Sequence, residues 1–410
     1  MVLLLMAGPS WSQTADSDPQ DVLKQNKLYF IPLPVISYDP AYGFIYGVSS
    51  AANILLGEQE DTRLSAGILS VTYTSLQQLV VKFHSNIYTR GDNWVFMGDW
   101  RFMISSQPTY GLGTGPQSEI LLNEDRPGFE LGDYLDGVDQ AELMEFSFFR
   151  FYEIALRQIV DDFYVGVGFH LDNYRKIQDR LLDLSEDPPV ITNHFAYSLL
   201  HGFDPEEYVI SGPSVNALLD TRDNINNPYN GQFAFIQFRM LPTWLGSSQD
   251  ATSLWLEYRD YFPMSKRVPR NILALWLYSS ITVSGQLPYM GLPALGWDQS
   301  SKSGRAYPQG RFRGENLFYS EIEYRFRLPI RLKIPLINKE RNHLGAVLFA
   351  NMTSASASDL NVQLFDYLKM GAGAGLRFMM NKNTRTNIAI DYGFGADNKG
   401  AIYFGLNEYF

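Results

Sequence analysis

The sequence predicts an all-β fold, a transmembrane antiparallel β-barrel of about sixteen strands. Three observations lead to this prediction. Apolar and polar residues alternate with a period of two through most of the chain. The alternating runs last about ten residues or more, which is the length that a tilted strand needs to cross a bilayer. Long and short connections between the runs also alternate along the chain.

The alternation separates an apolar face from a charged one. Trp94 and Phe102 share one face of a segment whose other face carries Asp99 and Arg101. The same pattern recurs in three further segments, 163–172, 318–327 and 388–395. Strict alternation marks a strand with one apolar face. A soluble sandwich also alternates, but its strands average about 5–6 residues. The longer runs and the repeated charges favour a barrel with lipid outside and water inside.

The candidate strands number about sixteen, an even number, as single-chain bacterial barrels require. They are expected at 28–38, 42–55, 63–74, 78–88, 94–106, 144–157, 162–174, 207–219, 231–243, 251–262, 271–285, 315–329, 343–354, 369–380, 386–395 and 400–410.

The connections provide an independent check on the strand count. The longest ones, 107–143, 175–206 and 286–314, all follow odd-numbered strands, as does 355–368. Most connections after even-numbered strands are short. Short periplasmic turns and long outer loops are the normal asymmetry of such barrels. With a periplasmic N-terminus, the long loops therefore face outward.

The N-terminus predicts export to the bacterial outer membrane. Residues 1–12 combine an apolar stretch with small residues around Trp11, which indicates a signal peptide. The basic residues that usually precede the apolar stretch are missing, so two interpretations of the start stay open, a truncated one and a misassigned one. Residues 13–27 form a short polar periplasmic segment, and 28–410 form the barrel.

Composition excludes several functions. The net charge is -11 and no basic stripe is present, so a nucleic-acid partner is not expected. The chain has no cysteine, which excludes disulfides and thiolate metal sites. The five histidines form no short pair, and 211–214 lacks the glycines of a nucleophile elbow. The chain is therefore expected not to be an enzyme and to have no cofactor.

An acidic loop raises the question of a metal. Its carboxylates are Glu124, Asp125, Glu130, Asp133, Asp136 and Asp139. Hard cations favour clustered carboxylates, but the spacing lacks the EF-hand pattern and its glycine. A solvated acidic loop is the favoured interpretation, and no metal is predicted.

The segment "SGRAYPQGRFRGENLFYSEIEYRF" (303–326) is the most informative in the chain. Closely spaced arginines before an amphipathic strand favour charge-assisted pairing with carboxylates in the lumen. The segment resembles the signature loop of the BamA/TamA-type bacterial surface antigen superfamily, in which an Arg-Gly-aromatic tip of a long outer loop folds back into the lumen. The matching residues are Arg305, Ala306 and Tyr307, with Gly310, Arg311, Arg313 and Gly314 following. Alanine replaces the usual central glycine.

Three other motifs support the resemblance. "PLPVISYDPAYGFIYG" (32–47) resembles the family's first hairpin. "DTRDNINNPYNG" (220–231) resembles its periplasmic turn motif, with Asp220, Arg222 and Asp223. The ending "IYFGLNEYF", with Gly405 and Phe410, resembles the C-terminal signal recognised during barrel insertion.

The resemblance also implies partners for the loop arginine. In the strand after the loop, the family commonly has an aspartate that meets this arginine, and here the matching residue is Asn351. Asn351 can accept a hydrogen bond but supplies no charge. Arg305 is therefore expected to pair with Asp391 or Glu323, both on the inward face of the alternation.

The function that the resemblance implies is outer-membrane biogenesis, or translocation of protein or lipid through a lateral seam between the first and last strands. The expected partners are outer-membrane lipid and lipopolysaccharide, the barrel assembly machinery during insertion, and a separate periplasmic protein, since the chain has no room for the polypeptide-binding repeats of related assembly proteins. Two alternatives stay open: a passive or gated pore, and a purely structural surface barrel.

Overall fold

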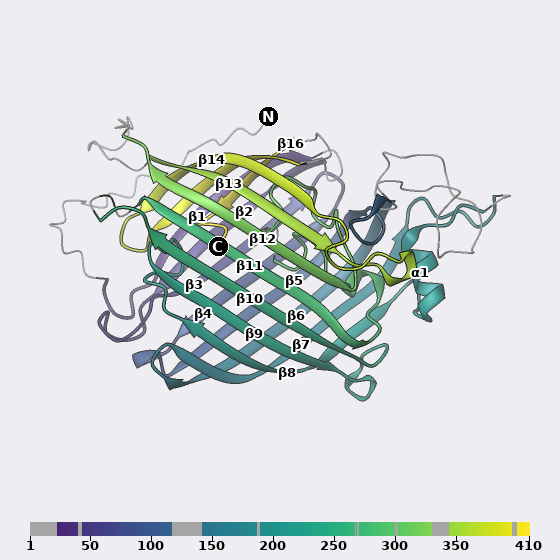
Figure 1. The fold of residues 1–410 in the computed structure, drawn as a ribbon, viewed down its shortest axis with the longest axis horizontal. Coiled ribbons are helices and arrows are strands. Elements are labelled where there is room, and N and C mark those ends of the chain that lie inside the picture. The colour runs from purple at the N-terminus through teal and green to yellow at the C-terminus, as the bar shows by residue number, and fades with distance from the viewer. Residues whose placement is uncertain are drawn as a thin grey trace.

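The computed structural model describes residues 23–39, 43–116, 142–186, 189–266, 268, 270–299, 302–329, 344–395 and 400–410. These residues form sixteen antiparallel strands of one sheet, in which each strand pairs with the next along the chain. The tilted strands wrap around an interior (Figure 1). This arrangement confirms the predicted fold class. No helix within these ranges is long and apolar enough to cross a membrane.

Each predicted strand range overlaps one observed strand. The strands are β1 (Tyr29–Asp39), β2 (Gly43–Ile54), β3 (Ser65–Thr74), β4 (Leu79–Tyr88), β5 (Trp94–Thr109), β6 (Glu142–Val160), β7 (Phe163–Asp179), β8 (Tyr208–Asp220), β9 (Gly231–Leu241), β10 (Ala251–Pro263), β11 (Ile272–Gly285), β12 (Asn316–Arg327), β13 (Leu344–Ala355), β14 (Lys369–Asn381), β15 (Thr386–Gly395) and β16 (Gly400–Leu406).

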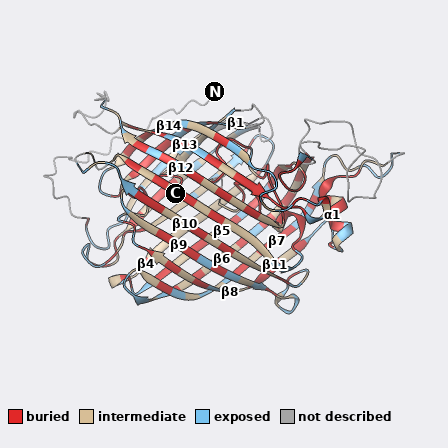
Figure 2. Cartoon of the chain, in the orientation of Figure 1, coloured by how far each residue is buried: buried red, intermediate tan, exposed pale blue. Residues whose placement is uncertain are grey.

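The two-residue alternation of the sequence becomes an alternation of burial along each strand (Figure 2). In β7, Val167 is 64% exposed on the outer face, while Tyr164 and His170 are buried inside. The same holds in β15, where Tyr392 is exposed and Asp391 is buried. Apolar residues therefore cover the wall that faces lipid, and polar residues face the lumen.

The strand ends differ from the prediction at several places. β5 and β6 both continue further toward their shared loop, to Thr109 and from Glu142. The last strand ends at Leu406 instead of residue 410, because Asn407 adopts a positive φ of 67° that turns the chain out of the sheet.

A helix within a predicted connection is a second correction. α1 (Asn193–His201) lies in the segment between β7 and β8, beyond one end of the barrel (Figure 1). The Thr192 hydroxyl accepts a hydrogen bond from the Phe195 N–H, and Gly202 ends the helix in the left-handed conformation. These are normal start and stop signals for a helix.

The described part of the N-terminal region packs against a turn. Leu23 is buried with Leu55 and Leu64, and the Asn26 N–H donates to the Leu55 carbonyl at 2.8 Å. The predicted signal peptide and residues 13–22 lie outside the described residues, as does the acidic loop.

Candidate functional site

Residues 286–299 and 302–315, between β11 and β12, enter the lumen as a folded loop. Its two arms pair with each other, since the Leu295 N–H donates to the Phe312 carbonyl at 2.9 Å and the Gly310 N–H donates to the Leu295 carbonyl at 2.7 Å. Leu295, Trp297 and Phe312 are buried. Apolar packing and backbone pairing thus hold the loop in one conformation, which confirms that a long loop fills part of the lumen.

Arg305 lies at the tip of this loop and is fully buried. Its guanidinium forms ion pairs with Glu321 and Glu323 of β12 and with Asp391 of β15. The Asn351 side chain of β13 donates to the Arg305 carbonyl at 2.8 Å. The structure therefore brings Arg305 together with all three residues expected near it, and adds Glu321.

Two further arginines complete a buried charge cluster. Arg325 pairs with Glu323 at 2.5 Å, and Arg377 pairs with Asp391. Burying a charge away from water costs free energy unless an opposite charge and hydrogen bonds compensate for the lost hydration. Burial alone would lower the pKa of Arg305, but Glu321, Glu323 and Asp391 outweigh it and hold that pKa well above its usual value.

Aromatic rings enclose the Arg305 guanidinium. It lies 4.0 Å from the centre of the Phe349 ring and 4.3 Å from that of Tyr409. Cation–π contacts of this kind strengthen when water is excluded. Tyr403 of β16 adds two hydrogen bonds at the loop tip, accepting from the Ala306 N–H and donating to the Tyr307 carbonyl, both at 3.0 Å.

Glycines on the inner face of β14 and β15 make room for the tip. A Cβ atom on Gly393 would lie 2.9 Å from the Ala306 nitrogen, and one on Gly371 would lie 2.5 Å from the Ala306 Cβ. Real side chains cannot approach so closely. Ala306 itself has a φ of 134°, a region that favours glycine. Alanine in place of the motif's glycine is therefore strained. The space for its methyl group is provided by Gly371 and Gly393 on the barrel wall.

The remaining loop residues support the arm that returns to β12. Arg313 is buried and donates to the Tyr289 and Leu292 carbonyls at 3.0 and 3.3 Å. Arg311 stacks over Tyr110. Gly310 and Gly314 lie against Gln107 and Ser356, respectively, on the barrel wall.

The C-terminal residues 407–410 turn into the lumen and join the same cluster. The Glu408 carboxylate accepts from Arg377 and from the Asn387 amide, both at 2.6 Å. The Phe410 carbonyl accepts from Arg325 at 2.8 Å. Phe410 also packs on Trp276 and is buried in the folded barrel. Its role as an insertion signal stays a prediction. Gly405 lies in β16, next to the Tyr409 ring.

The predicted turn motif lies at the other end of the barrel wall. Asp220 accepts hydrogen bonds from Arg222 at 2.8 Å and from the Tyr88 hydroxyl at 2.6 Å. Asp223 pairs with Arg385 at 2.8 Å. The motif thus ties together turns that are far apart in the sequence, and its Asn226 carbonyl accepts a hydrogen bond from the Glu408 N–H at 3.1 Å, at the edge of the Arg305 cluster.

Sequence reasoning did not assign partners to Glu321, Arg377, Tyr403 or Glu408. Period-two alternation places Glu321 and Arg377 on the inner face with Glu323 and Asp391, but it does not indicate which of these charges meet. The alternation could not have indicated Glu408, because β16 ends at Leu406, before that residue. No group of residues suited to a metal ion occurs within the described ranges.

A barrel whose lumen holds a loop latched by a buried arginine defines the class of this protein. The Omp85 superfamily domain profile matches residues 206–410, half of the chain. The chain therefore belongs to the Omp85 superfamily, which confirms the family resemblance. No curated protein matches the sequence significantly.

Two solved structures share the fold. BamA from Haemophilus ducreyi lacking POTRA domains 1-3 has a TM-score of 0.52 at 11% identity, over 94% of this chain and 70% of that one. CdiB from Acinetobacter baumannii also has a TM-score of 0.52, at 12% identity, over 94% of this chain and 60% of that one.

Proposed function

We propose that this protein is an integral barrel of the bacterial outer membrane that inserts or translocates protein or lipid through a lateral seam between β1 and β16. Membership of a superfamily of insertases and transporters supports the general role. The observation that carries the proposal is the seam itself. Within the described strands, every neighbouring pair forms a ladder except β16 and β1.

Two prolines explain why this edge of β1 pairs weakly. β1 forms an unbroken ladder with β2 from Tyr29 to Asp39. In an extended strand, alternate residues direct their N–H groups to the same side. Pro32 and Pro34 have no backbone N–H to donate. Because the ladder with β2 is unbroken, the N–H groups that pair with β2 belong to the alternate residues, and the backbone nitrogens of the two prolines lie on the side of the seam. The seam therefore lacks two backbone hydrogen bonds that an ordinary strand would offer.

The opposite edge is short. β16 has seven residues, whereas β1 has eleven. Residues 407–410 turn inward to the charge cluster. Only the seven residues of β16 are therefore available to pair with β1 across the seam. An unpaired strand edge is a template for another strand. An incoming polypeptide could add there, or lipid could pass.

The proposal includes partners. Outer-membrane lipid and lipopolysaccharide would surround the barrel, the barrel assembly machinery would insert it, and a separate periplasmic protein would deliver its substrate. The apolar outer faces of β1 and β16, with Phe30 and Ile402 exposed, support contact with lipid at the seam itself.

A disulfide across the seam tests the proposal. The chain has no native cysteine, so engineered pairs are clean. Cysteines at Phe30 with Phe404, and at Ile36 with Ile402, lie on the outer faces of β1 and β16. A disulfide forms only in a pair whose Cα atoms come within about 4.4–6.8 Å. Insertion of an unfolded barrel protein and lipid transfer are measured in proteoliposomes. Locking the seam should abolish the activity, and reduction should restore it.

The matched control is a cysteine pair at Tyr392 and Ile402, which face each other across the permanent ladder of β15 and β16. Oxidising this pair should leave activity unchanged. Full activity with a locked seam would contradict lateral opening.

A gated pore is the second candidate, because the loop overlies a cavity in the lumen. Deleting residues 300–314 should then raise the conductance of the barrel in a planar bilayer sharply. Conductance that stays unchanged would count against a loop-gated channel.

A further inference from the structure

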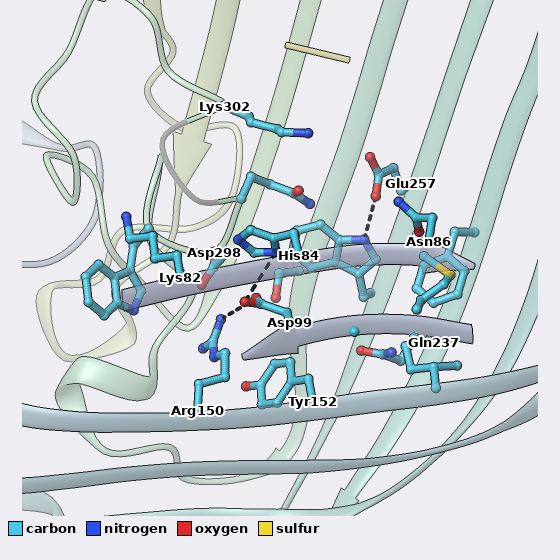
Figure 3. Close-up of a pocket in the computed structure, with 18 of the residues that line it drawn as sticks. Lys82, His84, Asn86, Asp99, Arg150, Tyr152, Gln237, Glu257, Asp298 and Lys302 are labelled. Atoms are coloured by element: carbon cyan, nitrogen blue, oxygen red, sulfur yellow. Dashed lines mark hydrogen bonds and ion pairs between the residues drawn. The ribbon is translucent and has the colours of Figure 1, made fainter. Parts of the chain in front are cut away.

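A second polar region of the lumen lies beneath the loop and reaches the edge of the Arg305 cluster at Glu408 and Tyr409. It is a cavity of about 540 Å³ whose charged wall comes mainly from β4 to β7, β9 and β10 and from the loop. Figure 3 shows Lys82, His84, Asp99, Asp298 and Lys302 around it. Small-molecule sites typically enclose about 300–1,000 Å³. The cavity is therefore large enough for a small organic ligand.

Much of the charge on this wall is already neutralised. Asp172 accepts two hydrogen bonds from Arg150, at 2.7 and 2.6 Å. Asp99 is held in the same two-pronged way by Arg101, at 2.8 and 2.6 Å. Glu257 accepts from Arg259 at 2.7 Å. These pairs define the shape of the cavity and leave little charge for a ligand.

Three cations are left without such a partner. Lys82 of β4, Arg239 of β9 and Lys302 of the loop all line the cavity, and none forms an ion pair with a carboxylate in the described part of the chain. Arg239 donates to neutral groups instead, the Gln237 amide oxygen and, at 3.4 Å, the Tyr152 hydroxyl.

One carboxylate of the cavity wall, that of Asp298, lacks an arginine partner. Its single charge does not balance the three cations. The Asp298 side chain accepts from the Ala294 N–H at 2.9 Å, and burial raises its pKa. Burial, with the positive charge of Arg259 next, lowers the pKa of Lys302 to about 8. Burial thus disfavours the charged form of both side chains, and a bound anion would stabilise the ammonium form of Lys302.

We propose that this cavity binds a phosphate-bearing ligand of small-molecule size, whose phosphate is held by one or more of the wall cations that lack a carboxylate partner, Lys82, Arg239 and Lys302. Phosphate suits such donors, because it offers several charged oxygens. Phe233, Phe235 and Trp255 line the same cavity and would pack against the organic part of the ligand.

The route to the cavity follows from its lining. At one end Trp297 closes it, packed among the buried aromatic residues of the loop end of the barrel. At the other end it reaches Arg222 and Ile225 of the turn after β8 and the residues that follow β16. A ligand would enter from the end that carries the short turns. This site needs no lateral opening and is independent of the proposed function.

Binding to the full chain in detergent tests the site. Inorganic phosphate is titrated by calorimetry, and phosphatidylglycerol retention is measured by native mass spectrometry. The wild type should bind saturably with one site. The double variant Lys82→Gln/Lys302→Gln should weaken binding at least about tenfold, since charge-assisted hydrogen bonds are lost. The matched control Lys24→Gln/Lys27→Gln removes two exposed lysines outside the lumen and should bind like the wild type.

The outcomes separate the sources of the phosphate. Saturable binding of inorganic phosphate that the lumen variant loses supports a free phosphate ligand. Phosphatidylglycerol retention that the lumen variant loses, without competition by phosphate, supports a lipid headgroup. Equal binding by the lumen variant and the control, or no saturable binding by the wild type, overturns the proposal. Heat-modifiable migration verifies folding, and Arg239→Gln provides a second test if the double variant fails to fold.

Discussion

The two sides of the lumen use the same residue types to opposite effect. On the seam side, formed by β12 to β15, Arg305 and its three carboxylates are packed without space, and the inner residues of β14 and β15 are largely glycine. On the far side, β4 to β10 carry long charged side chains around an open cavity. The position of the loop tip makes the difference. The charges that the tip covers hold the loop in place, and the charges that it leaves uncovered stay accessible to a ligand.

The largest expected effect comes from opening the latch. Arg305→Ala leaves Glu321, Glu323 and Asp391 buried without their central partner. Breaking one partner from a buried pair costs about 3–5 kcal/mol. The barrel should unfold at a clearly lower temperature, measured by heat-modifiable migration on gels. A barrel as stable as the wild type would contradict the latch.

The matched control removes an exposed arginine. Arg180 pairs with Glu145 at 2.7 Å near the barrel rim, where both side chains are exposed to solvent. Arg180→Ala should cost no more than about 1 kcal/mol, because water screens exposed pairs.

The second prediction concerns the glycine platform. Gly393→Val should push the loop tip away from β15, because even a Cβ would meet the Ala306 backbone at 2.9 Å. Such overpacking costs about 1–3 kcal/mol. The displaced tip should become accessible, measured by labelling of a cysteine introduced at Ser303. Ala374→Val, which introduces the same side chain at a position of β14 that faces outward, should leave labelling unchanged.

A smaller gain is expected from relieving strain at the tip. Ala306 has a φ of 134°, and glycine adopts such a conformation without a steric penalty. Ala306→Gly should stabilise the docked loop by about 1 kcal/mol, the lower end of the usual cost of strained backbone. Protease cleavage of the loop should slow in this variant; faster cleavage would show that the Ala306 methyl contributes more than it costs.

The last prediction concerns a single side chain and is a pH dependence on the cavity side. The charges facing Lys302 are Arg259 and Glu257 of β10, Arg222 of the turn after β8 and His84 of β4. Lys82 of β4 and Asp298 of the loop line the same cavity. The pKa of Lys302 is about 8 in the folded protein, against about 10.4 in an unfolded chain. Between these values the unfolded chain binds the extra proton, so stability rises with pH.

Wild-type stability should therefore increase relative to Lys302→Met from about pH 8 to about pH 10.4 and level off outside that window. The difference of about 2.4 between the pKa values of about 10.4 and about 8 sets an upper limit of about 3 kcal/mol on this gain. Thermal unfolding at each pH measures it. The opposite slope would mean that an anion holds Lys302 protonated.

The sequence alone determined the strands, their number and the face on which each residue lies, because a period of two is a local property of an extended chain. It placed Arg305, Glu323 and Asp391 in the lumen for the same reason. Only the tertiary structure decided that Glu321 and Glu408 join them, that Gly371 and Gly393 make room for Ala306, and that three cations share a cavity. These facts depend on how the curved wall brings distant strands and the chain end to one point, and a local sequence pattern contains no information about such long-range contacts.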